Sequence, residues 1–417
     1  MSPSENLAQT TIQQCLEIGV REFVVCAGSR NSPLVLEVMR HEIQVWSFFE
    51  ERSAAFFALG RCRDQEAPVA VITTSGTAVA ELLPAMIEAT YLRAPLLCIT
   101  GDRPKDFRNS GAPQAIEQAG IFCMYARDSW DVQDENFDLK RWDGWGPAHL
   151  NVCFDEPLLS SGRKEKHPAP PNVPDPPFSE PITKSRSAKF SFIPDLVLLG
   201  AIQRKDRSSV HEFLVDLGSP ILADATCGLR ESPQLSKLML QSGESVVQSD
   251  LPKTVLRIGG VPSCRFWRDL ENLPDVEVMS VLGRGFTGLA RKSVMFGSLQ
   301  SLQFEGKPTT NLIRNDQGRQ GKLEALFAAF PQSEPALIRS LSKRIPAKSI
   351  VFLGNSLPIR EWNLAATFED RRFEVWANRG ANGIDGNLST FLGISAHSAE
   401  SWGIFGDLTT LYDLSAP

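Results

Sequence analysis

The sequence predicts an α/β protein in which parallel β-sheets carry helices on both faces. Apolar, strand-like runs alternate with helical patterns along the chain, and such alternation is typical of parallel sheets. The chain has 417 residues, a length that favours two or three domains that each bury a core of their own. The alternation falls into three blocks, of which two look complete and the third looks cut short.

The first block extends over residues 1–160. Its strand candidates are rich in Val, Ile and Phe, and its helix candidates place apolar residues at helical spacing. The predicted strands are 22–26, 44–49, 68–73, 95–100 and 149–154. The predicted helices are 4–18, 51–62 and 76–92, with Ser4 as the N-cap of the first.

A proline-rich segment separates the first block from the rest. Seven of the 28 prolines fall between Pro168 and Pro181, a density that excludes both helix and central strand. We therefore expect a linker at 161–190, a central domain at 191–335 and a third domain at 336–417. The predicted strands of the central domain are 195–202, 220–224, 254–260 and 276–282. The third domain has a predicted helix at 337–345 and predicted strands at 349–354, 372–377 and 401–407.

Composition narrows the class of function. The chain is 42% hydrophobic and 22% charged, with a net charge of −6, so it lacks the basic surplus of a nucleic-acid-binding protein. It has no basic and apolar leader and no apolar stretch of 18 residues, which predicts a cytoplasmic protein without a membrane span. Its eight cysteines form no C-x-x-C pair and suggest buried, reduced thiols. Its five scattered histidines offer little basis for a zinc site.

Polar motifs follow the predicted strands. The strand at 22–26 leads into Gly28, Ser29 and Arg30, where open α/β sheets bind ligands and where an arginine can hold a carboxylate with two hydrogen bonds. The alternative is an ordinary turn with an exposed arginine. The glycine fingerprint G-x-G-x-x-G is absent, which argues against a dinucleotide site.

The next strand end carries Glu50 and Glu51 at the start of a predicted helix. Acidic residues are common in a first helical turn because they suit the helix dipole. The alternative is a functional carboxylate that acts on a nitrogen atom of a cofactor.

Two further strand ends supply hydroxyls, an arginine and a glutamine. Thr74, Ser75, Gly76 and Thr77 form a glycine turn into a helix, an arrangement that suits a polar or anionic ligand. The strand at 95–100 leads into a long polar loop, and such loops are often functional. This loop contains Arg103 and Gln114.

The third block adds Ser356, Arg360 and Arg379 after its own strands. Several arginines at strand ends, in a chain without a basic surplus, predict a substrate with several carboxylates or a phosphate. Surface ion pairs are the alternative for each arginine taken alone. The last strand ends in Gly406 and Asp407, which predicts a magnesium ligand beside a bound phosphate.

Seven motifs, taken in order, carry a family resemblance. They are GSRNSPL, EERSAAFFALG, TTSGTAVAELLPA, GDRPKDFRNSGAPQAI, GNSLPIR, NRGANGIDG and GDLTTLYDL. The series resembles that of the 2-succinyl-5-enolpyruvyl-6-hydroxy-3-cyclohexene-1-carboxylate synthase family, the thiamine diphosphate enzymes of menaquinone biosynthesis. The likeness extends from Ser29 to the last residues, although in 195–282 only the architecture is similar.

The resemblance implies a three-domain thiamine diphosphate fold, with pyrimidine-binding, central and diphosphate-binding domains. The active site would lie between two subunits of a homodimer or a dimer of dimers. The cofactors would be thiamine diphosphate and Mg²⁺ or Mn²⁺. The implied reaction decarboxylates 2-oxoglutarate and adds the remaining unit to isochorismate, with release of CO₂.

The resemblance also assigns roles to residues. Glu51 would be the catalytic residue, acting on the aminopyrimidine ring of the cofactor. The implied cofactor-binding residues are Glu51, Thr74, Ser75, Gly76, Thr77, Ile384, Gly406 and Asp407, with Asp407 as the metal ligand. The implied substrate-binding residues are Ser29, Arg30, Arg103, Gln114, Ser356, Arg360 and Arg379.

The resemblance leaves alternatives open. The chain could be another thiamine diphosphate enzyme of 2-oxoacids, such as an acetolactate synthase, or a non-catalytic partner subunit. The family completes its metal site some two dozen residues after the Gly-Asp pair, beyond Pro417 of this sequence. We therefore expect a truncated third domain, poor cofactor binding by the 417-residue chain alone and weak or no activity.

Overall fold

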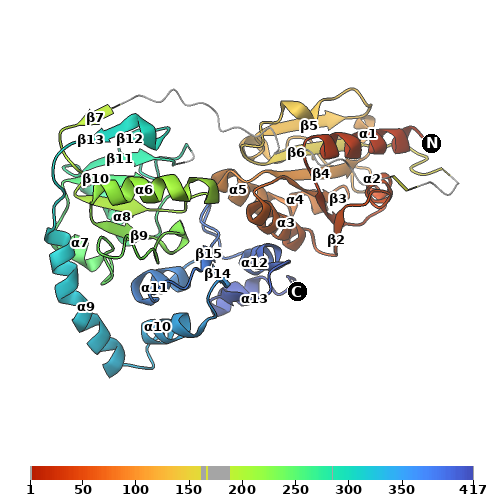
Figure 1. Cartoon of the computed structure of the whole chain (residues 1–417). Helices are drawn as coiled ribbons and strands as arrows, with labels where there is room; N and C mark the ends of the chain where they lie inside the picture. Colours follow the sequence, from red (N-terminus) through yellow and green to blue (C-terminus); the bar gives the residue numbers. More distant parts are fainter. Residues whose placement is uncertain (1, 161–165, 168–187, 284, 417) are drawn as a thin grey trace. The chain divides into compact units, whose positions relative to one another are not determined.

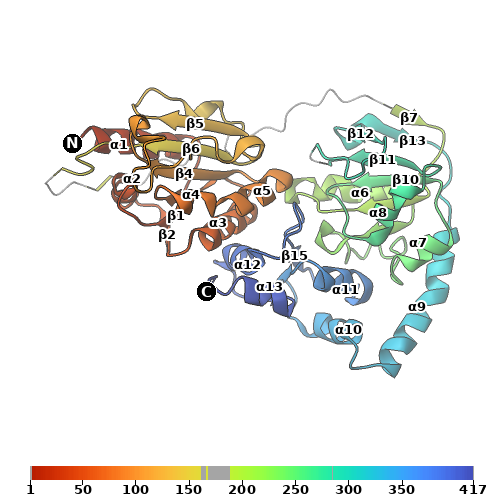
Figure 2. The same cartoon turned by 180° about the vertical axis from the view of Figure 1, so that it is seen from behind.

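A computed structural model describes residues 2–160, 166–167, 188–283 and 285–416. The chain forms two compact units (Figures 1 and 2). The first comprises Met1–Pro181, Asn378–Ser398 and Asp407–Pro417, and the second comprises Ile182–Ala377 and Ala399–Gly406. The division into three domains that the sequence predicts stays a prediction.

The first unit is built on a parallel sheet of six strands, in the order β2-β1-β3-β4-β6-β5. The strands are β1 (Glu22–Cys26), β2 (Gln44–Phe48), β3 (Val69–Thr73), β4 (Leu96–Asp102), β5 (Asp128–Val132) and β6 (Ala148–Cys153). The helices are α1 (Pro3–Glu17), α2 (Ser32–Val38), α3 (Glu51–Gln65), α4 (Thr77–Ala80), α5 (Leu83–Leu92), α12 (Asn387–Ser395) and α13 (Asp407–Tyr412).

Alternation along the strands creates a core on each face of this sheet. In β1, Phe23 and Val25 pack in the core that contains α1 and α2. Val24 and Cys26 point the other way, into the core that contains α3 and α5. Every residue of β1 is buried, as expected for a central strand covered on both faces.

The second unit contains three parallel sheets. A five-stranded sheet has the order β12-β11-β10-β8-β9, a two-stranded sheet pairs β13 with β7, and a three-stranded sheet has the order β15-β14-β16. The strands are β7 (Ala188–Phe190), β8 (Leu196–Leu199), β9 (Ile221–Ala223), β10 (Thr254–Ile258), β11 (Glu277–Val281), β12 (Val294–Phe296), β13 (Leu302–Phe304), β14 (Ile350–Leu353), β15 (Glu374–Trp376) and β16 (Ser401–Ile404).

Helices cover these sheets as well. The core around β8 and β9 contains α6, whereas the opposite face of the same sheet packs on α7, α8 and α9. The core of the three-stranded sheet contains α10 and α11. The helices are α6 (Arg207–Leu217), α7 (Ser245–Ser249), α8 (Arg265–Asp269), α9 (Asn311–Ala329), α10 (Glu334–Arg344) and α11 (Leu357–Ala365).

The predicted α/β class with parallel sheets is confirmed, but two helix details were wrong. The N-cap of α1 is Ser2 and not Ser4, because the Ser2 hydroxyl accepts a hydrogen bond from Glu5 N at 3.2 Å while the Glu5 carboxylate accepts one from Ser2 N at 2.7 Å. The predicted helix 76–92 is divided into α4 and α5, since Pro84 lies in the first turn of α5 and cannot continue a preceding helix.

Several elements were missed. Strand β5 lies at the edge of its sheet and buries only Trp130 and Val132, so its apolar signal is weak. Helix α9 is the long helix in Figure 2 and buries only Leu312 and Asp316. It therefore lacks the apolar stripe by which a helix is predicted from sequence. Residues Ala188–Phe190 of the predicted linker form β7. Apart from these three and residues 166–167, the predicted linker lies outside the described residues.

Candidate active site

The turn after β1 is fixed from inside by one asparagine. Asn31 is fully buried, its Oδ1 accepts a hydrogen bond from Gly28 N at 2.8 Å, and its Nδ2 donates to Cys26 O at 2.8 Å. These two bonds pair backbone groups that the end of the strand would otherwise leave unsatisfied. The turn therefore holds Ser29 and Arg30 in a defined position at the carboxyl end of the strand.

Three strand ends pack closely around this turn. A Cβ atom on Gly28 would lie 2.6 Å from Thr74 Cβ, so only glycine allows the turns after β1 and β3 to touch. A Cβ on Gly101, near the end of β4, would lie 3.0 Å from the carbonyl oxygen of Arg30. The structure thus brings the predicted residues Arg30 and Thr74 to one edge of the first sheet.

The Arg30 side chain is mostly buried and already has partners. Its Nη1 donates a hydrogen bond to Phe154 O at 3.1 Å and lies 3.5 Å from Glu156 Oε1. Both partners follow β6, so Arg30 connects the first strand end to a more distant one. These contacts orient the guanidinium at the polar edge of the sheet.

The glycine turn after β3 lies beside the long loop after β4. Gly76 has a φ angle of +86°, and a Cβ on it would lie 3.5 Å from Gln114 Cβ. Ser75 is buried, whereas Thr77 begins α4 and is exposed. Thr74, Ser75, Gly76 and Gln114 therefore form one contiguous part of the edge.

Arg103 holds the start of the same loop. Its backbone N donates a hydrogen bond to Asp102 Oδ1 at 2.8 Å, and its Nε donates to Pro113 O at 3.0 Å. The guanidinium also lies 5.5 Å from the centre of the Phe107 ring. Because Pro113 precedes Gln114, these contacts hold the start of the loop against its middle, beside Gln114.

Sequence reasoning missed a buried polar network beneath this edge. Gln118 accepts a hydrogen bond from Gly76 N at 3.1 Å and donates to Gly101 O at 3.1 Å and to Asn151 Oδ1 at 2.8 Å. Asn151 Oδ1 also accepts from Thr100 Oγ1 at 2.9 Å. Polar residues inside the otherwise apolar strands β4 and β6 were the available signal, because a buried polar group needs a partner.

The network ends in an ion pair. Arg108 donates hydrogen bonds to both carboxylate oxygens of Asp131, at 2.7 and 2.8 Å, and one to Asp102 at 3.1 Å. Burial alone would raise the pKa of Asp131, but hydrogen bonds from Arg108 and Asn151 outweigh it and hold this pKa well below its usual range. Asp131 is therefore a charged anchor for the loop that contains Arg103.

Glu50 and Glu51 differ sharply in their surroundings. Glu50 is the N-cap of α3, and its carboxylate accepts hydrogen bonds from Ser53 N at 2.8 Å and Arg52 N at 3.2 Å. Glu51 is half-buried, and the part of the chain that the structure describes gives its carboxylate no hydrogen bond. The Cys26 thiol has its pKa raised to about 12 by burial and then by the negative charges of Glu51 and Glu50. Glu51 therefore lies near the end of β1.

Asp407 begins α13 and is exposed. Its Oδ1 accepts a hydrogen bond from Leu408 N at 2.8 Å. The other end of α13 lies against the start of α3, where Arg52 donates to Tyr412 O at 3.2 Å and lies 5.2 Å from the Tyr412 ring. Ser415 donates to Glu50 Oε2 at 3.1 Å.

Arg379 and Ile384 belong to a loop of the first unit that is tied to α5. The Glu88 carboxylate is buried and accepts hydrogen bonds from Gly380 N at 2.7 Å and Ala381 N at 2.6 Å. Burial raises the pKa of Glu88 despite these bonds. A cavity of about 200 Å³ lies along this loop, lined by Phe56, Leu83, Pro84, Ile87, Glu88, Asn378, Ala381, Gly383 and Asp385.

The remaining predicted residues belong to the second unit. Ser356 lies just before α11 with a φ angle of +73°, and its carbonyl oxygen accepts a hydrogen bond from Arg360 Nε at 2.8 Å. Arg360 is exposed. Gly406 follows β16 and ends the second unit. The structure therefore pairs Ser356 with Arg360 on one turn of α11.

Comparisons with known proteins identify the family. Residues 5–121 match the family described as thiamine pyrophosphate enzyme, N-terminal TPP binding domain. In the residues that the structure describes, every helix is too short or too polar to cross a bilayer.

Three relatives share the name 2-succinyl-5-enolpyruvyl-6-hydroxy-3-cyclohexene-1-carboxylate synthase. The protein of Bdellovibrio bacteriovorus is 43% identical over 98% of this chain and 81% of its own length. That of Akkermansia muciniphila is 40% identical over 100% of this chain and 80% of its own length. That of Chloroflexus aurantiacus is 34% identical over 95% of this chain and 76% of its own length. The chain belongs to the 2-succinyl-5-enolpyruvyl-6-hydroxy-3-cyclohexene-1-carboxylate synthase family of thiamine diphosphate enzymes.

Proposed function

We propose that this protein decarboxylates 2-oxoglutarate and joins the remaining four-carbon unit to isochorismate, with release of CO₂. The observation that carries the proposal is the polar edge of the first sheet, where Arg30, Thr74 and Gln114 meet beside the strand end that precedes Glu51. Both substrates are dicarboxylates, which explains why arginines gather at strand ends in an acidic protein. The setting would be the cytoplasm, in menaquinone biosynthesis.

The residues at this edge fit thiamine diphosphate. Thr73 Oγ1 is buried at the end of β3 and has no hydrogen-bond partner among the described residues. The Glu51 carboxylate likewise accepts no hydrogen bond within the described part of the chain. When bound, the cofactor supplies the electron sink for the carbon atom that loses CO₂.

Glu51 is the proposed acid–base residue. Its carboxyl group would bond to a pyrimidine nitrogen of the cofactor and exchange a proton with it. Glu50 is excluded from this role because its two oxygens already cap α3. The turn of Thr74, Ser75, Gly76 and Thr77 would hold the cofactor, with Ile384 beside its thiazolium ring.

The proposed substrate contacts divide by chemistry. The guanidinium groups of Arg30, Arg103, Arg360 and Arg379 would pair with substrate carboxylates. Ser29, Gln114 and Ser356 would form neutral hydrogen bonds with the same molecules. The position of Arg30, held through Nη1 by Phe154 O, supports a fixed orientation for its other N–H groups.

Asp407 is the proposed ligand for Mg²⁺ or Mn²⁺ bound to the cofactor diphosphate. It is exposed, and its Oδ1 already accepts a hydrogen bond from Leu408 N, which orients the carboxylate. Gly406 beside it would let the backbone approach the phosphate. A homodimer or a dimer of dimers is part of the proposal.

Substrate preference tests this function. The purified chain, with thiamine diphosphate and Mg²⁺, is given isochorismate together with either 2-oxoglutarate or pyruvate, and isochorismate loss is followed by absorbance. Whatever turnover is measured should be greater with 2-oxoglutarate than with pyruvate, because pyruvate lacks the second carboxylate that the arginines would bind. The same assay is applied to a protein extended at its carboxyl end to the length of the relatives.

Two results would contradict the proposal. A preference for pyruvate would indicate an enzyme of the acetolactate synthase type. Inactivity of both the 417-residue and the extended protein, with cofactor and Mg²⁺ bound, would indicate a non-catalytic subunit. Calorimetric titration with thiamine diphosphate separates that second result from a simple failure to bind the cofactor.

A further inference from the structure

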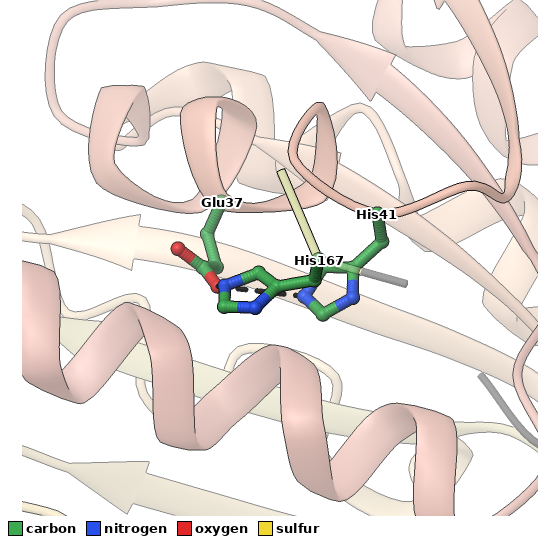
Figure 3. Close-up of side chains that lie close together, drawn as sticks. All are labelled: Glu37, His41 and His167. Carbon is green, nitrogen blue, oxygen red and sulfur yellow. Dashed lines mark ion pairs between the residues drawn. The ribbon is translucent and has the colours of Figure 1, made fainter. Parts of the chain in front are cut away.

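A partly buried cluster of two histidines and a glutamate lies at the far end of α2 from the Ser29–Arg30 turn. Glu37 is in the last turn of α2, His41 follows one turn later, and His167 comes from a distant part of the chain (Figure 3). Glu37 Oε1 lies 3.4 Å from His41 Nε2 and 3.3 Å from His167 Nε2. All three donor atoms lie within 4.8 Å of one another.

Two atoms of this cluster are buried without hydrogen bonds. Within the described residues, Glu37 Oε1 and His167 Nε2 have no hydrogen-bond partner, although they face each other. Burial of unpaired polar atoms costs free energy, so such atoms call for an explanation. Two imidazoles and a carboxylate whose lone-pair atoms converge in this way are typical of metal ligands.

We propose that Glu37, His41 and His167 bind a divalent transition-metal ion of the Zn²⁺ class. Zinc bonds of about 2.0–2.2 Å in a tetrahedron place the ligand atoms about 3.3–3.5 Å apart. The two separations from Glu37 Oε1, 3.3 and 3.4 Å, match that spacing. Two imidazoles and one carboxylate leave the fourth position to water.

Neighbouring groups orient two of the proposed metal ligands. Glu37 Oε2 accepts a hydrogen bond from Arg40 Nη1 at 2.6 Å, which orients the carboxylate and leaves Oε1 toward the histidines. The backbone N of His167 donates to Arg40 O at 2.8 Å, which fixes the position of His167.

Metal binding would change the cluster in a defined way. The two imidazoles stack with ring centres 4.7 Å apart and an interplanar angle of 22°. To share one ion, both Nε2 atoms must point at it. The ion would then join α2 to the segment that contains His167 and stabilise the first unit by linkage.

Metal titration of the full chain tests the proposal. The protein, freed of any affinity tag and held in excess Mg²⁺, competes with a chromogenic chelator for Zn²⁺, and Co²⁺ gives an optical spectrum of the site. We expect one Zn²⁺ per chain. Glu37→Gln, His41→Gln and His167→Gln should each weaken binding by at least about 100-fold and abolish the Co²⁺ bands.

Two control variants separate this site from others. His397→Gln alters a histidine outside the cluster and should leave Zn²⁺ binding unchanged. Asp407→Asn alters the proposed ligand of the cofactor metal and should also leave it unchanged. A negative result in the Zn²⁺ titration would not contradict the proposed function, because the titration requires neither thiamine diphosphate nor turnover.

Several results would overturn the proposal. One is the absence of a tightly bound Zn²⁺ in the wild-type protein. Another is Zn²⁺ binding by all three cluster variants that equals that of the wild type. The third is loss of Zn²⁺ binding in either control variant. Circular dichroism of the metal-free variants checks that they fold. If Glu37→Gln and His41→Gln do not fold, His167→Gln still tests the site, because its side chain is partly exposed. A pH-dependent stability that the histidine variants remove, without Zn²⁺ binding, would identify a simple ion pair instead.

Discussion

The carboxyl edges of the two large parallel sheets differ, although the sheets share one architecture. At the edge of the first sheet, strand ends present hydroxyls, arginines and amides above a buried polar network. At the edge of the five-stranded sheet, the strand ends after β8 and β10 are glycines that pack backbone against backbone. The difference teaches that two neighbouring strand ends of a parallel sheet can face a ligand together only where their turns do not pack against each other.

Glycines close the space between β8 and β10 at the second edge. A Cβ atom on Gly200 would lie 1.9 Å from Gly260 O, and one on Gly259 would lie 2.5 Å from Ala201 O. Gly260 N also donates a hydrogen bond to Ala201 O at 2.9 Å. The turns after β8 and β10 therefore bind each other and leave no space between them for a ligand.

A buried arginine completes the closure. Arg257 of β10 is fully buried, and its guanidinium donates to Phe286 O at 2.6 Å and to Thr287 O at 3.1 Å. It also lies 5.2 Å from the Trp267 ring. Burial lowers the pKa of Arg257 to about 10. Here an arginine at a sheet edge holds a loop, whereas the arginines of the first edge are candidates for substrate binding.

The largest expected effect concerns the open edge. Glu51→Gln should lower kcat by about 100- to 10,000-fold, because it removes the proposed acid–base group without changing its shape. Steady-state kinetics with 2-oxoglutarate and isochorismate measure the loss. Glu50→Gln is the matched control, and it should cost about 1 kcal/mol of stability through a weaker helix cap while most activity remains. Equal loss of activity in both folded variants would contradict the assignment.

The next effect concerns the closed edge. Gly200→Ala should destabilise the second unit by about 3 kcal/mol, because the added Cβ would overlap Gly260 O and force the two turns apart. Urea unfolding measures it. Gly318→Ala in α9, where a Cβ would meet nothing within 4 Å, should instead stabilise by about 0.5–1 kcal/mol. Equal stability of Gly200→Ala and the wild type would show that this edge is not closed by backbone packing.

The buried network of the first sheet should make stability depend on pH. Burial lowers the pKa of His149 to about 4 from an ordinary 6.5. Below pH 6.5 the unfolded chain takes up a proton that the folded chain does not, so stability falls as pH drops from 6.5 toward 4. The contribution of His149 between about pH 7.5 and pH 5 is about 2 kcal/mol.

His149→Gln should remove that part of the pH dependence. Thr100 Oγ1 lies 2.9 Å from His149 Nε2, and a glutamine amide can replace this partner without titrating. Denaturant unfolding at the two pH values measures the change. His397→Gln, at a side chain 56% exposed, serves as the control. An unchanged acid sensitivity in His149→Gln would contradict the role of this residue.

The smallest effect concerns the support of the open edge. Gln118→Ala should cost about 1–2 kcal/mol of stability, because Gly76 N and Asn151 Oδ1 lose a buried partner. It should also raise the KM for thiamine diphosphate more than it lowers kcat, since Gln118 is fully buried and holds the turn from beneath. Gln13→Ala, on the exposed face of α1, should change neither quantity. A loss confined to kcat would argue for a direct chemical role of Gln118.

Much of the fold could be predicted from the sequence because long apolar runs have one physical cause, the burial of the segment. The strand at 22–26, for example, is buried on both faces and has the apolar run Phe, Val, Val, Cys after its first residue. Edge strand β5 and the exposed helix α9 lack that cause and were missed. Arg30, Thr74 and Gln114 could be expected at one edge because each lies in a segment that follows a strand, and parallel strands end at the same edge; their role as site residues stays a prediction.

The sequence by itself determined the class of chemistry, since its ordered motifs and strand-end residues name a thiamine diphosphate enzyme family. Only the tertiary structure decided which of two adjacent glutamates caps a helix, and that Gln118 supports Gly76. It also brought together His41 and His167, which the sequence shows as scattered histidines. The physical reason is that hydrogen bonds and metal sites depend on distances of a few ångströms between residues far apart in the chain, and local sequence pattern does not encode such distances.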